Sequence, residues 1–95
     1  MKNFDDFWIY YLKKHAHPKN RLFHFYGTGI VHVIFFYVFV TGHIKYLWLG
    51  PFFGYSFAWL GHFLIEKNTP TTFGHPIWSA VADIRMFYLM LLKKM

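Results

Sequence analysis

Apolar side chains recur at helical spacing along most of the chain and predict four helical segments. Between residues 4 and 15 large apolar residues repeat every three or four positions, with two acids in the first turn and two lysines in the last. This segment is too short to cross a bilayer, so we predict an amphipathic helix lying in the membrane interface. His15 follows Tyr11 by four residues and therefore shares its apolar face.

Two longer apolar runs follow this segment. Residues 22–44 are 23 positions without Lys, Arg, Asp or Glu, and residues 46–65 are another 20. At ~1.5 Å per residue, each run is long enough for a hydrocarbon core of about 30 Å. We predict a first span over residues 18–43 and a second over 51–67, joined as an antiparallel transmembrane hairpin.

The C-terminal part of the chain predicts one more apolar helix. Residues 77–92 are apolar apart from Asp83 and Arg85. At this length the helix either spans a thinned bilayer or is re-entrant against the others. The predicted fold class is an all-α membrane protein, with residues 1–95 forming a single membrane domain.

Composition supports a membrane location. The 95 residues are 56% hydrophobic and only 15% charged, more apolar surface than a soluble domain of this size can bury. The lipid bilayer is therefore the first expected partner. The sequence contains no cysteine, so any metal ion must be held by nitrogen and oxygen ligands.

The net charge of +6 does not indicate nucleic acid, because the basic residues flank apolar runs and form no stripe. Lys45 alone marks the turn of the predicted hairpin, and the basic residues at its opposite end are Lys13, Lys14, Lys19, Arg21 and Lys67. The positive-inside rule places that end in the cytoplasm. A spanning third helix would carry two C-terminal lysines across and weaken the bias without reversing it.

Two polar segments, residues 15–24 and 61–70, interrupt the apolar pattern. An antiparallel hairpin brings them to the same depth, so His15, His24 and His62 are expected to converge. Imidazole groups gathered near hydrocarbon predict a transition-metal site. Glu66 lies four residues after His62 and is either a fourth ligand or the acceptor that fixes the tautomer of a histidine.

Other polar residues have secondary interpretations. Asn20 either supports a ligand or caps a helix, and His17 is a helix cap and reserve ligand. His32 is expected to form an interhelical hydrogen bond, and His75 lies in a proline-rich loop near the site. Asp83 either faces the polar cluster or accepts from a neighbouring donor.

At these residues the chain resembles a family of small membrane proteins whose characterised fungal member is an iron-dependent 2-hydroxy fatty acid dioxygenase. The pattern H-x-x-P-x-N-x-x-x-H, followed by G-H-x-x-x-E-K-x-x-P, is met by His15, Pro18, Asn20, His24, Gly61, His62, Glu66, Lys67 and Pro70. The later run from Pro76 to Met86 is similar to that of shorter, bacterial-type members, which implies a bacterial inner membrane. The chain lacks the extra apolar segments of eukaryotic members.

The resemblance implies an Fe(2+) cofactor and the cleavage of a 2-hydroxy fatty acid by O2, giving CO2 and the acid one carbon shorter. It implies that His15, His24 and His62 bind iron, with catalytic roles for Glu66, Lys67 and Asn20. Lys67 or Arg21 would pair with the substrate carboxylate. The alternative is a non-enzymatic membrane protein that binds metal or haem, or transports metal or protons.

Overall fold

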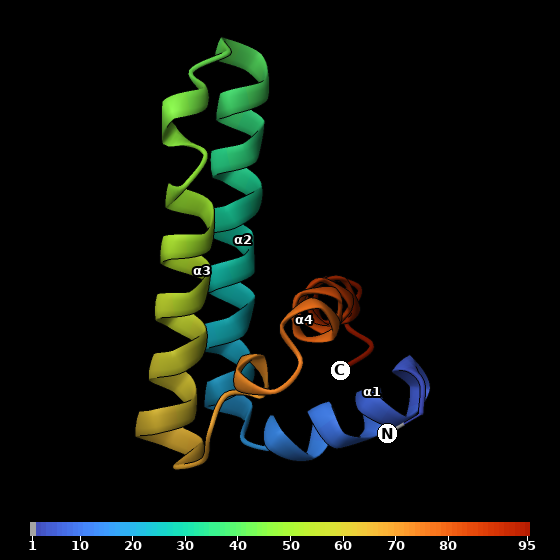
Figure 1. Ribbon diagram of the computed structural model, residues 1–95. Helices are drawn as coiled ribbons and strands as arrows, with labels where there is room; N and C mark the ends of the chain where they lie inside the picture. Colours follow the sequence, from blue (N-terminus) through green and yellow to red (C-terminus); the bar gives the residue numbers. More distant parts are fainter. Residues whose placement is uncertain (1) are drawn as a thin grey trace.

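The computed structural model describes residues 2–95, which fold entirely into helices and short connections (Figure 1). In chain order the helices are α1 (Phe4–Lys14), α2 (Pro18–Thr41), α3 (Leu49–Leu60) and α4 (Pro76–Leu91). A π-helix, Gly61–Glu66, continues α3 without a break, and 3₁₀ turns at Ile44–Tyr46 and Thr71–Phe73 lie in the connections. The all-helical prediction is confirmed.

The long helix α2 begins and ends on clear local signals. The His17 side chain accepts a hydrogen bond from the Lys19 amide at its N-terminus, and Pro18 occupies the first helical position. Gly42 ends the helix with φ of 73°, where its N–H donates to the Val38 carbonyl. Within residues 2–95, α2 is the one helix long and apolar enough to cross a membrane, judged by length and composition.

Helices α2 and α3 lie side by side and run in opposite directions (Figure 1). Small residues let them approach closely, because a Cβ on Gly27 would stand 2.9 Å from the Cβ of Phe57 and 3.2 Å from the Gly54 carbonyl oxygen. Such contacts are typical of helix pairs in membranes. The second arm begins at Leu49, two residues before the predicted start, since a proline at position 51 is tolerated in the first turn.

Helices α1 and α4 lie across the lower part of the α2–α3 pair and pack against each other (Figure 1). Their contact forms a small buried core of Phe7, Tyr11, Ala82 and Met86. The guanidinium of Arg85 lies 4.6 Å from the centre of the Trp8 ring, so the contact is a cation–π interaction between α4 and α1. Because α4 crosses the pair, it does not form a third arm parallel to α2.

Candidate metal centre

Three imidazole rings from three separate elements meet at the lower end of the α2–α3 pair. His15 ends α1, His24 lies in the second turn of α2, and His62 lies in the π-helix. The Nε2 atom of His15 is 3.1 Å from that of His24 and 3.0 Å from that of His62. All three side chains are buried, with exposures of 0%, 4% and 1%. The structure thus brings together the three histidines that the sequence singles out.

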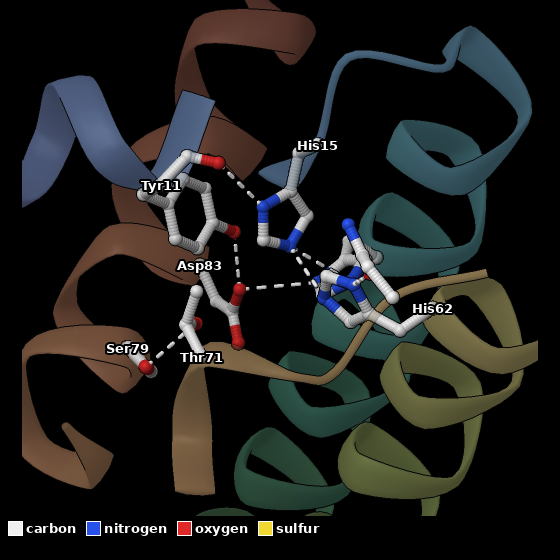
Figure 2. A network of polar contacts seen from close by, with 8 residues as sticks. Tyr11, His15, His62, Thr71, Ser79 and Asp83 are labelled. Atoms are coloured by element: carbon white, nitrogen blue, oxygen red, sulfur yellow. Dashed lines mark hydrogen bonds and ion pairs between the residues drawn. The ribbon is translucent and has the colours of Figure 1, made fainter. Parts of the chain in front are cut away.

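The outer nitrogen of each ring faces an oxygen atom. His15 Nδ1 lies 2.7 Å from the Tyr11 carbonyl oxygen, and His24 Nδ1 lies 3.1 Å from Asp83 Oδ1. A carbonyl oxygen and a carboxylate only accept hydrogen bonds, so both rings must carry their proton on Nδ1. Figure 2 shows His15 between Tyr11 and His62.

The third ring is oriented by an amide whose own direction is fixed. His62 Nδ1 lies 2.7 Å from Asn68 Oδ1, and Asn68 Nδ2 donates to the Lys14 carbonyl at 3.2 Å. Since the Lys14 carbonyl accepts only, the Asn68 nitrogen must face it and the oxygen must face His62. His62 therefore also carries its proton on Nδ1.

These tautomers leave three unprotonated Nε2 atoms facing one another at close range. Without a proton on any Nε2 atom, the rings cannot donate hydrogen bonds to one another, and their lone pairs repel. Burial, with smaller effects from the neighbouring His24 and His62, lowers the pKa of His15 to about 2, so the His15 ring itself is neutral at neutral pH.

These three residues could hold a metal ion, since one ligand nitrogen from each lies within 4.8 Å of the other two. Neighbouring nitrogen ligands at right angles, each ~2.1 Å from a first-row metal, are about 3.0 Å apart, close to the two distances from His15. The donor set fits a transition metal, and each ring also has the outer hydrogen-bond acceptor typical of metal-bound histidine.

The π-helix explains how His62 and Asn68 come together. Its wider turn lets the His62 carbonyl accept from the amides of both Lys67 and Asn68. Lys67 adopts the left-handed conformation, with φ of 57° and ψ of 42°, which turns the chain back toward α1. π-helices are frequent at functional sites. The sequence analysis did not predict this one, or the role of Asn68.

Tyr11 was also missed. Its hydroxyl donates a short hydrogen bond to Asp83 Oδ1, the same atom that accepts from His24, and its ring stacks on His15 at 3.8 Å (Figure 2). Burial, followed by the Asp83 charge, raises the Tyr11 pKa well above its ordinary value, so the phenol keeps its proton. Asp83 thus faces the polar cluster, one of its two predicted roles.

Asn20 is buried beside the histidines without a partner. Its exposure is 0%, and neither Oδ1 nor Nδ2 has a hydrogen-bond partner among residues 2–95. Its Oδ1 lies against Gly61, the residue before His62. Asn20 does not cap a helix here, because His17 is the cap of α2. An unpaired buried amide is costly, and it leaves Asn20 able to hydrogen-bond a molecule bound beside the histidines.

Glu66 does not join the cluster. Its Oε1 accepts a short hydrogen bond from the backbone N–H of His17, and the outer nitrogens of the three rings face other oxygens. The predicted alignment of His62 and Glu66 assumed α-helical spacing, which the π-helix does not have. In this structure Glu66 instead ties the end of the π-helix to the start of α2.

The remaining predicted residues lie around the cluster. Arg21 Nε donates to the His15 carbonyl at 2.6 Å, and Lys67 is exposed. His75 is outside the cluster and stacks on Trp78 at 5.4 Å. His32 forms the predicted interhelical bond, in which its Nε2 accepts from the Tyr88 hydroxyl at 2.7 Å.

The chain matches the family described as "2-hydroxy-palmitic acid dioxygenase Mpo1-like" over residues 1–95. The chain therefore belongs to the Mpo1-like family, as the sequence motifs indicate. No curated protein and no solved structure matches it.

Proposed function

We propose that this member of the Mpo1-like family is an Fe(II)-dependent dioxygenase that shortens 2-hydroxy fatty acids by one carbon. The observation that carries the proposal is the convergence of three Nε2 lone pairs in a buried site, each with its tautomer fixed from outside. Such a set of donors could hold a cation, and the family description suggests the class of reaction.

The proposed reaction balances without an external reductant. A 2-hydroxy acid and O2 give the acid one carbon shorter, CO2 and one water. The bond between the carboxyl carbon and C2 breaks, and the hydroxyl-bearing C2 becomes the new carboxyl carbon. All four electrons that reduce O2 come from the substrate, so the site needs neither a flavin nor a reducing partner.

His15, His24 and His62 would hold the iron, and Asp83, Asn68 and the Tyr11 carbonyl would keep their rings aimed. Bound iron would supply a Lewis acid for the substrate oxygens and a redox-active centre through which the substrate's electrons reach O2. Asn20 has an unpaired amide beside the cluster, which can hydrogen-bond a substrate oxygen or a water. Lys67, exposed at the same end, would attract the carboxylate from the interface.

The membrane setting follows from charge and helix direction. α2 would cross the bilayer with α3 as the second arm, and α1 and α4 would lie at the cytoplasmic interface because they run across the pair. The basic residues at this end agree with the positive-inside rule. The expected location is the bacterial inner membrane, with the histidines on the cytoplasmic side.

The test is turnover by purified protein reconstituted anaerobically with Fe(II) in detergent. Adding 2-hydroxypalmitate labelled with ¹³C at C1 and then O2 should give labelled CO2 and the unlabelled C15 acid. His15→Ala, His24→Ala and His62→Ala should each abolish both products. His43→Ala is the matched control, because His43 is exposed near the turn at the opposite end.

Metal analysis separates the site from the reaction. Wild type should retain about one iron per chain after desalting, and each cluster variant should lose most of it while His43→Ala keeps it. Full iron retention in all three cluster variants would refute the metal assignment. Iron-loaded wild type without product would leave the metal site standing and refute the reaction.

A further inference from the structure

An apolar groove of about 370 Å³ runs between α2, α3 and α4 and begins at the metal centre. His24 and Asp83, which belong to the cluster and its support, line one end of the groove. Phe35 and Pro51 line it farther along the α2–α3 pair. The groove is therefore continuous with the site at which we place the reaction.

The groove follows one face of α2. Its lining residues on this helix share one face at steps of three or four residues, and they are His24, Thr28, Val31, His32 and Phe35. The distance along the helix from position 24 to position 35 is about 16 Å. On α3 the groove is lined by Gly54, which has no side chain, and by Ala58, which has a single methyl group.

The groove is lined mainly by apolar atoms, and its polar lining residues besides His24 and Asp83 are Thr28, His32 and Tyr55. Both nitrogens of His32 are engaged, because Nδ1 donates to the Thr28 carbonyl at 2.8 Å and Nε2 accepts from the Tyr88 hydroxyl at 2.7 Å. The walls therefore offer mostly apolar contact, which suits a single hydrocarbon chain.

We propose that this groove binds the acyl chain of the substrate, with its 2-hydroxy carboxylate at His24 and its methyl end at Phe35 and Pro51. The proposal rests on the function proposed above and adds the site that selects chain length. An extended chain advances about 1.25 Å per C–C bond, so the groove accommodates roughly 13 bonds. Phe35 then limits how much longer a chain can be held.

A photoreactive substrate tests the placement directly. A 2-hydroxy fatty acid with a diazirine at its methyl end would be bound to the iron-loaded protein without O2, irradiated, and mapped by mass spectrometry. Labelling should occur at Val31, Phe35 or Pro51 and fall when excess 2-hydroxypalmitate is added. Labelling of the outward-facing Val33 by dissolved probe should not fall, because that residue lies 68% exposed outside the groove.

Chain-length preference gives a second readout. Thr28→Phe fills the groove one turn beyond His24, so the ratio of C16 to C8 turnover should fall by about tenfold or more. Val33→Phe adds a similar ring to the outer face of the same helix and should leave the ratio unchanged. Phe35→Ala should instead raise turnover of acids longer than C16 relative to C8.

The two readouts separate the two proposals. If wild type is inactive, the crosslinking still reports the groove, because it needs no turnover. If wild type is active but competition never reduces labelling at Val31, Phe35 or Pro51, and Thr28→Phe keeps the wild-type ratio, the groove proposal is overturned while the reaction stands.

Discussion

Gly61 lies directly against the side-chain amide of Asn20, and no space remains between them for a Cβ. Such an atom would overlap Asn20 Oδ1 and stand 3.0 Å from its Cγ and 3.3 Å from the Cβ of Phe23. This contact sets how closely α2 and the π-helix approach, one residue before His62. The distance between His24 and His62 therefore depends on Gly61, although Gly61 has no side chain that could bind a metal.

Gly61→Ala should separate the two helices and weaken the metal centre. The added methyl must displace a buried side chain, which costs about 1–3 kcal/mol of unfolding free energy. We expect a lower thermal midpoint in detergent and reduced iron retention. Gly74→Ala is the matched control, since a Cβ there meets nothing within 4 Å. Equal midpoints and equal iron content for the two variants would contradict the account.

Glu66→Ala should leave the iron in place and lower stability. The structure gives Glu66 a capping contact to the His17 amide, and loss of a helix cap costs about 1 kcal/mol. Thermal unfolding and metal analysis of the same preparation would measure both quantities. Glu66→Gln, which keeps an oxygen acceptor, should restore most of the stability. Loss of iron from both variants would instead favour the ligand role predicted from sequence.

Asp83→Ala should reduce iron affinity without removing any proposed ligand. Asp83 fixes the proton of His24 on Nδ1 and also accepts from Tyr11. Loss of such an outer partner typically lowers metal affinity by about 10- to 100-fold. Competition against a chelator of known affinity would give the change. Asp5→Ala is the matched control, because it removes an exposed acid from α1. Its iron affinity, measured by the same chelator competition, should equal that of wild type.

The metal-free protein should lose stability as the pH falls. His15 has a pKa of about 2 in the folded chain, because of burial and its histidine neighbours, against 6.5 when unfolded. The unfolded state therefore binds a proton that the folded state does not. The free energy of unfolding is highest above pH 6.5 and falls as the pH drops below this value. Between pH 7.5 and pH 5.0 we expect a loss of roughly 2 kcal/mol.

Thermal unfolding of chelator-treated protein at the two pH values measures this loss. His15→Gln removes the titrating ring and should flatten the dependence on pH, although its midpoint at pH 7.5 will differ from that of wild type. A wild-type midpoint that does not change between pH 7.5 and pH 5.0 would show that His15 is not shielded as described.

The sequence predicts the helices and the meeting of the three histidines, because apolar periodicity and antiparallel direction are properties of residue order. It does not reveal the π-helix, since no residue type marks where a helix widens by one residue per turn. For the same reason no sequence signal marks Asn68 as a partner of His62, and α-helical spacing wrongly aligns Glu66 with His62. Tyr11 looked like one more member of an apolar stripe, because its hydroxyl partner lies 72 residues away.

The π-helix also makes the protein sensitive to insertion or deletion of residues between His62 and Asn68. Between His62 and Asn68 the side chains of Phe63 and Leu64 are exposed, so exchanges of side chain there should be well tolerated. Removing a single residue from this stretch would rotate everything after it about the helix axis and carry the Asn68 oxygen away from the imidazole that it orients. Homologous chains should therefore vary freely in the identity of these intervening residues and hardly at all in their number.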